Sequence, residues 1–211
     1  MIQIVHPKIE DYLRRLYDDG DPVRHEMEEL GRKRDFPIVG PLVGRHLLLL
    51  CRTISARRVF ELGSGYGYSA LFFARAVGEE GEVHCTELSA DNVALAKGFL
   101  SRAGVWGRVH YHQEEAKAAL ARVGGVFDII YNDIDKDGYP ETVELAHAHL
   151  RKGGLFITDN VLWSGRILEG EDDGSPATAG VREFTKRLLG HPGFLTAIDP
   201  TRDGVAVAVR L

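Results

Sequence analysis

Short β-branched segments alternate with longer helical ones along most of the chain, and this pattern predicts alternating strands and helices. Strands are expected at residues 58–62, 82–87, 108–112, 127–132 and 155–158. Helices are expected near residues 68–77, 90–103, 114–122, 140–150 and 179–189. Alternation at this spacing predicts a parallel sheet that is covered by helices on both faces.

The two ends of the chain depart from this alternation. Residues 194–198 and 205–211 are predicted strands, and residues 199–204 are too short for a parallel crossover, so we expect an antiparallel hairpin. Near the N-terminus, Pro7 and the Asp21-Pro22 pair each begin a charged helix. A third helix follows Pro41, and its leucines at 47–50 are expected to be buried on several faces.

These elements predict one α/β domain over residues 1–211. Its core, residues 36–211, is expected to be a doubly wound, mostly parallel seven-stranded sheet with a C-terminal antiparallel hairpin. Residues 1–35 form an N-terminal helical segment in this prediction. The polar loop at residues 164–178 is long for a compact domain, which makes it a candidate lid.

Composition narrows the function classes. A length of 211 residues suits a single domain with a full core. The net charge of −5 gives no global attraction to nucleic acid or acidic lipid. Cys51 and Cys85 lie in apolar surroundings and are expected to be buried free thiols. No signal peptide opens the chain and no apolar run approaches the roughly 20 residues that span a bilayer, so we expect a cytoplasmic protein without membrane contact.

A glycine-rich turn follows the first core strand, with Gly63, Gly65 and Gly67 spaced G-x-G-x-G. Glycines allow tight backbone dihedrals and a close approach to a ligand. Glu87 ends the next predicted strand, 20 residues after Gly67, where a carboxylate can accept the ribose hydroxyls of a nucleoside. The spacing differs from the G-x-G-x-x-G of dinucleotide-binding proteins, but at this point an NAD enzyme remains an alternative.

Polar residues follow two later strands at the edge where ligands of open α/β sheets bind. Asp133 follows the fourth core strand, and Asp159 and Asn160 follow the fifth, so their side chains should converge. Two carboxylates and an amide oxygen are hard ligands that suit Mg²⁺ or Mn²⁺. Lys136 lies near enough to take a proton from a hydroxyl whose pKa such a metal lowers.

The segments 61–71 (ELGSGYGYSAL), 133–139 (DIDKDGY) and 158–165 (TDNVLWSG) together resemble the cation-dependent O-methyltransferases of the catechol and caffeoyl-coenzyme A type. The resemblance runs in order from about residue 36 to residue 211. It implies a Rossmann-like class I methyltransferase that typically forms homodimers. Its implied chemistry is transfer of a methyl group from S-adenosylmethionine (SAM) to one hydroxyl of a vicinal dihydroxy aromatic small molecule, a phenolic acceptor that chelates Mg²⁺.

The resemblance also implies roles for individual residues. Positions that match SAM contacts, together with Gly65 of the glycine turn, are Val39, Glu61, Gly63, Ser64, Ser69, Glu87, Ala116 and Asp133. Asp133, Asp159 and Asn160 match the metal ligands, and Lys136 matches the catalytic lysine beside Asp133. Ser164 falls near the acceptor, and Trp163 is expected to supply an apolar wall there.

Three alternatives remain at this stage. In the first alternative, the methyl acceptor is a hydroxylated uridine in transfer RNA. This alternative requires a phosphate-binding patch formed by basic side chains of the first 35 residues: Arg14, Arg15, Arg24, Arg32, Lys33 and Arg34. An NAD-dependent oxidoreductase is opposed by the glycine spacing and the terminal hairpin. A SAM-binding module without catalysis is opposed by the intact set of Asp133, Lys136, Asp159 and Asn160.

Overall fold

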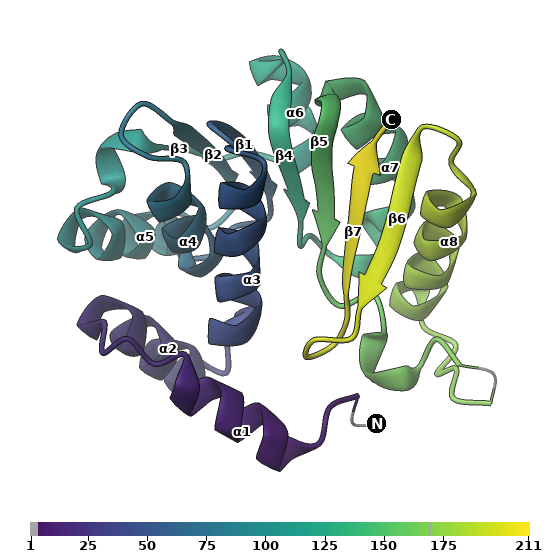
Figure 1. Ribbon diagram of the computed structural model, residues 1–211, viewed down its shortest axis with the longest axis horizontal. Coiled ribbons are helices and arrows are strands. Elements are labelled where there is room, and N and C mark those ends of the chain that lie inside the picture. The colour runs from purple at the N-terminus through teal and green to yellow at the C-terminus, as the bar shows by residue number, and fades with distance from the viewer. Residues whose placement is uncertain (1–3, 169) are drawn as a thin grey trace.

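The computed structural model of the protein describes residues 4–168 and 170–211. In that part of the chain, seven strands form one sheet in the order β3-β2-β1-β4-β5-β7-β6 (Figure 1). Only β7 runs antiparallel to its neighbours, so the predicted parallel sheet with a C-terminal hairpin is confirmed. The strands are β1 (Arg58–Leu62), β2 (Glu82–Thr86), β3 (Val109–His112), β4 (Phe127–Asn132), β5 (Leu150–Thr158), β6 (Phe194–Asp199) and β7 (Val205–Arg210).

Helices cover both faces of the sheet (Figure 1). On one face lie α3 (Gly40–Thr53), α4 (Tyr68–Ala76) and α5 (Ala90–Arg102), and on the other lie α6 (Ala116–Val123), α7 (Tyr139–His149) and α8 (Pro176–Gly190). Successive strand residues point to opposite faces, so Val59 packs in the first core cluster and Phe60 in the second. Both are fully buried, as expected for parallel strands covered on both sides.

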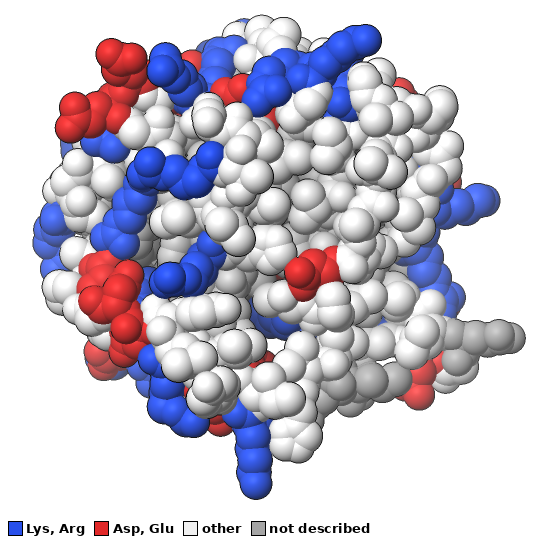
Figure 2. Space-filling view, viewed as in Figure 1, with Lys and Arg blue, Asp and Glu red and all other residues white. Residues whose placement is uncertain are grey.

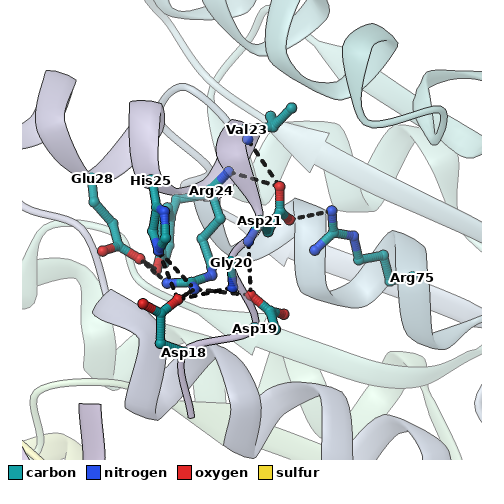
Figure 3. Close-up of polar contacts among 10 residues, drawn as sticks. Asp18, Asp19, Gly20, Asp21, Val23, Arg24, His25, Glu28 and Arg75 are labelled. Atoms are coloured by element: carbon teal, nitrogen blue, oxygen red, sulfur yellow. Dashed lines mark hydrogen bonds and ion pairs between the residues drawn. The ribbon is translucent and has the colours of Figure 1, made fainter. Parts of the chain in front are cut away.

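Two N-terminal helices, α1 (Pro7–Leu16) and α2 (Pro22–Arg34), lie at the end of the sheet where the parallel strands finish (Figure 1). The Asp21 side chain caps α2 by accepting hydrogen bonds from the backbone nitrogens of Val23 and Arg24, and Pro22 takes the first helical position. Asp21 also forms an ion pair with Arg75 of α4 (Figure 3). The predicted starts of both helices are therefore confirmed, and α2 is fastened to the core.

A buried guanidinium group holds the turn between α1 and α2 together (Figure 3). The Arg24 side chain is 4% exposed and donates to Asp18 at 2.8 Å, Asp19 at 2.9 Å and Glu28 at 2.6 Å. Glu28 also accepts the hydroxyl of Tyr68, from α4, at 2.7 Å. Arg24 joins the inter-helix turn to α2, and Glu28 joins α2 to α4. These contacts hold the N-terminal segment against the rest of the fold.

Three of the six basic side chains of the predicted phosphate-binding patch are engaged by carboxylates. Arg24 is buried among carboxylates, Arg14 pairs with Glu10, and Lys33 pairs with Glu29. On the face shown in Figure 2, basic and acidic side chains are interspersed around a broad uncharged area. This arrangement does not favour an RNA acceptor. No helix in the described ranges is long and apolar enough to cross a membrane.

Two element boundaries differ from the prediction by three residues or more. Strand β5 begins at Leu150, which pairs with Phe127, and a register shift before Ile129 accommodates the irregular start of the strand. Helix α8 begins at Pro176, three residues earlier than expected, and Ser175 caps it by accepting from the backbone nitrogen of Thr178 at 3.1 Å. The predicted loop at 164–178 is correspondingly shorter.

Hydrogen bonds from α8 hold part of the loop that was predicted to be a lid. The guanidinium of Arg182, in α8, donates to the carbonyl oxygens of Ile167 at 3.0 Å and Leu168 at 2.8 Å. Burial of the leucine run in α3 is likewise only partly as predicted. Leu47 is fully buried but Leu49 is 62% exposed, because α3 turns a single face to the core.

Candidate active site

The glycine-rich turn connects β1 to α4 and lies against the end of β4. Gly63 has φ +80°, and a Cβ atom there would lie 2.8 Å from the carbonyl oxygen of Asp133. A residue with a side chain would therefore be both strained and in collision with the backbone. Thr86, at the end of β2, accepts from the nitrogen of Gly63 at 2.9 Å through its hydroxyl group. The three parallel strands β2, β1 and β4 thus bring the turn and Asp133 together.

A cavity of about 740 Å³ opens at this edge of the sheet. Most residues predicted to bind SAM line it, from four loops and the starts of α4 and α6: Val39, Gly63, Ser64, Gly65, Ser69, Glu87, Ala116 and Asp133. Lys136, Asp159 and Asn160 line the same cavity. The structure therefore brings the predicted nucleoside contacts and the predicted metal ligands into one space.

Glu61 is the predicted SAM residue that does not line this cavity. Its side chain is fully buried behind the glycine turn, where the carboxylate accepts from the hydroxyl of Ser69 and from the thiol of Cys85. Burial raises the pKa of Glu61 to about 7, against the opposing effect of these hydrogen bonds. Because Ser69 does line the cavity, Glu61 is one hydrogen bond away from any ligand there.

Glu87 lies one residue beyond β2, at the mouth of the cavity. Its Oε1 accepts from the backbone nitrogen of Ser89, the N-cap of α5, at 2.7 Å. Its own backbone nitrogen donates to His112 in β3 at 3.2 Å. The carboxylate is thus positioned by two elements and remains partly exposed to the cavity, as a ribose contact requires.

Asp133 and Asp159 each come directly after a parallel strand, β4 and β5. The backbone nitrogen of Asp133 donates to Leu62 in β1, and that of Asp159 donates to Asn132 in β4. Asp159 is 1% exposed, and its Oδ1 has no hydrogen-bond partner in the described part of the chain. Burial, with the nearby charge of Asp133, raises the pKa of Asp159 to about 7.

This carboxylate pair fits a divalent cation. A buried, unpartnered carboxylate oxygen is costly unless a positive charge approaches it. Asn160 follows with a left-handed backbone, φ +57°, and supplies the amide of the predicted ligand set. Within the described ranges no cluster of three or more histidine, cysteine or acidic side chains has metal-binding geometry, so a cation here would need the Asn160 amide, water or substrate as further ligands.

Lys136 begins the short helical turn after β4. Its Nζ donates to Oδ1 of Asp133 at 2.9 Å and to the carbonyl oxygen of Ile134 at 3.3 Å. The same nitrogen lies 5.1 Å from the ring centre of Tyr139 and 5.9 Å from that of Trp163. These contacts fix the amine between the carboxylate pair and an aromatic wall.

A second cavity, of about 290 Å³, adjoins the first through the shared residues Asn160 and Arg202. Ser164 lines it, and residues of the N-terminal segment close its other side: Ile4, Val5, Pro7 and Glu10. Trp163 lines neither cavity; it packs near Lys136, and its Nε1 donates to Thr178 at 3.0 Å. Arg202 is a member of the site that the sequence interpretation missed.

The match to known proteins extends over most of the chain. A family model described as O-methyltransferase matches residues 25–211. The chain belongs to the O-methyltransferase family. A catechol O-methyltransferase of Niastella koreensis is 33% identical over 184 residues, which cover 81% of each chain. A catechol O-methyltransferase of Mycobacterium tuberculosis is 36% identical over 173 residues, covering 79% of this chain and 77% of the relative.

Solved structures agree with this family assignment. An O-methyltransferase from Bacillus cereus, solved with S-adenosylhomocysteine (SAH), has a TM-score of 0.86 at 26% identity and covers 97% of both chains. TomG from Streptomyces achromogenes, an O-methyltransferase solved with SAM, has a TM-score of 0.85 at 27% identity and covers 96% of both. The predicted SAM-dependent O-methyltransferase of class I fold is therefore confirmed at the level of family and fold, and the NAD-dependent alternative is not favoured.

Proposed function

We propose that this O-methyltransferase transfers the methyl group of SAM to one hydroxyl of a vicinal dihydroxy aromatic small molecule, with Mg²⁺ or Mn²⁺ held by Asp133, Asp159 and Asn160. The observation that carries the proposal is the unpartnered, buried Oδ1 of Asp159 beside Asp133, in the cavity that also contains the glycine turn. When bound, such a cation lowers the pKa of a coordinated hydroxyl.

The protein's own groups would then position the reacting atoms. The glycine turn and Glu87 hold the nucleoside, which directs the methyl group toward Asp133 and Lys136. Lys136, positioned by its hydrogen bond to Asp133, would accept the proton of the acceptor hydroxyl when its amine is neutral and so become the ammonium ion. The acceptor oxygen forms a bond to the methyl carbon, the carbon–sulfur bond breaks, and its electron pair returns to sulfur. Alignment of the two reactants within one cavity supplies much of the rate enhancement.

The acceptor side is also suited to a small molecule. The second cavity has a volume of only about 290 Å³, and the N-terminal segment lines one side of it. The similarity to two catechol O-methyltransferases supports an acceptor of this class. As the family resemblance implies, we also propose that the protein forms a homodimer. Analytical ultracentrifugation would test this oligomeric state.

An acceptor screen with methyl-labelled SAM, with and without Mg²⁺, tests this function. We expect label to appear on catechols and on dihydroxy aromatic acids only when the divalent cation is present. A parallel titration with SAM and NAD should show binding of SAM alone. Label transfer to transfer RNA and to none of the phenolic acceptors would overturn the small-molecule proposal.

A further inference from the structure

The turn between β6 and β7 inserts an arginine into the acceptor side of the site. Arg202 lines both cavities, next to Asn160 in each of them and next to Ser164 in the smaller one. Its neighbour Asp203 accepts from the backbone nitrogen of Ser164, so the turn is fastened to the segment after β5. The following inference rests on the proposed function, because it concerns what the acceptor carries besides its hydroxyl groups.

The guanidinium of Arg202 is held in place by a backbone hydrogen bond, and its charge acts on Asp133, Asp159 and Asp203 without a direct ion pair. Its NH1 donates to the carbonyl oxygen of Ile38, which fixes the side chain across the entrance to the site. Within the described ranges, no carboxylate lies within ion-pair distance of it. Asp133 pairs with Lys136 and Asp203 accepts from Ser164, whereas Oδ1 of Asp159 has no hydrogen-bond partner in the described part of the chain. The remaining donors of the guanidinium are left for a ligand.

A second guanidinium approaches the same place from α1. A Cβ atom on Gly40 would lie 3.7 Å from NH2 of Arg14 and 4.0 Å from NH1 of Arg202, so both groups flank this glycine. Arg14 is paired with Glu10, which lines the smaller cavity, at 2.6 Å. Two guanidinium groups and the carboxylate of Glu10 therefore lie near this wall of the acceptor cavity, which Asp203 also lines.

The backbone at this position carries an independent signal. Arg202 has φ +55°, a left-handed conformation that glycine adopts freely and long side chains rarely do. In the described part of the chain, six non-glycine residues have positive φ, and four of them surround this site: Asn160, Trp163, Ser164 and Arg202. Strained backbone persists only where the surrounding structure holds it, and it clusters at active sites and ligand-binding sites. The strain at residue 202 is therefore consistent with a use for the arginine side chain.

We propose that Arg202 binds a carboxylate group of the acceptor, so that the acceptor class is an aromatic acid with two adjacent hydroxyl groups. An arginine fork matches a carboxylate in shape and charge, and the resulting hydrogen bonds are stronger than neutral ones. The hydroxyl end would lie toward Asp159 and Asn160, and the acid end toward Arg202, since Asn160 and Arg202 line both cavities.

Two acceptors that differ only in the charge of the carboxylate group isolate its contribution to binding. The test compares 3,4-dihydroxybenzoate with its uncharged methyl ester, using wild-type enzyme and Arg202→Gly. Glycine suits the left-handed backbone, so this variant removes the guanidinium without new strain. We expect Arg202→Gly to raise KM for the acid by about tenfold to a hundredfold, with little change in kcat and none in the KM of the ester. Arg202→Lys should restore part of the preference for the acid.

Calorimetric titration of SAH-loaded protein with the acid gives a readout that does not depend on turnover, and it should show the same weakening. Arg187→Ala is the matched control, because Arg187 lies on α8 in an exposed pair with Glu183 and its loss removes the same charge. Equal wild-type efficiency with acid and ester, or equal losses with both in Arg202→Gly, would overturn the carboxylate site and leave the proposed function intact. Failure of the wild-type enzyme to methylate either compound with Mg²⁺ present would overturn both.

Discussion

Nζ of Lys136 lies 2.9 Å from Oδ1 of Asp133, three residues earlier in the chain. This pair connects the glycine turn, where SAM is proposed to bind, with the amine that is proposed to remove the proton. Asp133 is held by β1 through its backbone nitrogen and lies against the glycine turn, while Lys136 faces the rings of Tyr139 and Trp163. The same carboxylate can therefore hold the proton acceptor and contribute to a cation site, which links proton removal to the position of the methyl donor.

Replacement of Lys136 by methionine should separate binding from chemistry. We expect kcat to fall by about a hundredfold to ten-thousandfold, because a positioned acid–base group contributes on that scale. The dissociation constant of SAM, measured by calorimetry, should change little, since the lysine contacts Asp133 and not the glycine turn. Wild-type turnover in Lys136→Met would show that the acceptor proton leaves by another route.

SAM binding near pH 7 should release a proton from Glu61. Burial raises the pKa of this carboxyl group to about 7, and a cationic ligand nearby would favour its ionised form. Calorimetry of SAM binding at about pH 6.5, in buffers with different ionisation enthalpies, should therefore give different heats for the wild type and equal heats for Glu61→Gln. Buffer-independent heats in the wild type would contradict a coupling between Glu61 and the cofactor.

The same group should make the unliganded protein less stable as the pH rises. Because the folded pKa is raised, the native protein keeps its proton while the unfolded chain loses it, so stability falls between about pH 4.5 and pH 7. The full effect corresponds to about 3 kcal/mol. Urea denaturation should show that Glu61→Gln gains stability relative to the wild type from pH 5 to pH 8. An unchanged difference across this range would contradict the raised pKa.

Loss of Arg24 should loosen the N-terminal segment. Arg24→Met leaves Asp18, Asp19 and Glu28 without their shared cation, and we expect the free energy of unfolding to fall by roughly 2 kcal/mol. This is less than for a fully buried pair, because Asp18 and Asp19 are about half exposed. Lys33→Met is the control: its pair with Glu29 is mostly exposed, so the change should stay below about 0.5 kcal/mol. Equal losses in the two variants would contradict the buried cluster.

The sequence predicted the central strands well, for a physical reason. Strands β1 and β4 have the predicted ends at Arg58–Leu62 and Phe127–Asn132, because both are buried on two faces and bounded by turns. The start of β5 was missed since Gly153 and Gly154 interrupt its apolar pattern, and pairing with β4 overrides that interruption. The early start of α8 had a local signal, the Ser175-Pro176 cap, that the interpretation did not use.

The candidate site was predictable where it depends on strand ends and not where it depends on tertiary packing. Asp133, Asp159 and Asn160 were found because parallel strands finish at one edge. Arg202 was missed because only the pairing of β7 between β5 and β6 brings its turn beside Asn160. The wall formed by residues before α1 likewise depends on the Arg24 cluster, whose members look like ordinary surface charges in the sequence.

The central claim is that Asp159 holds a cation on which methyl transfer depends. The most direct test treats the enzyme with chelator, adds Mg²⁺ stepwise and measures the transfer of labelled methyl groups from SAM to 3,4-dihydroxybenzoate. The wild type should be inactive in chelator and regain turnover as Mg²⁺ is added. Asp159→Ala should bind SAM with wild-type affinity yet show no stimulation by Mg²⁺. Undiminished turnover of the wild type in chelator, or normal Mg²⁺ stimulation of Asp159→Ala, would contradict the account.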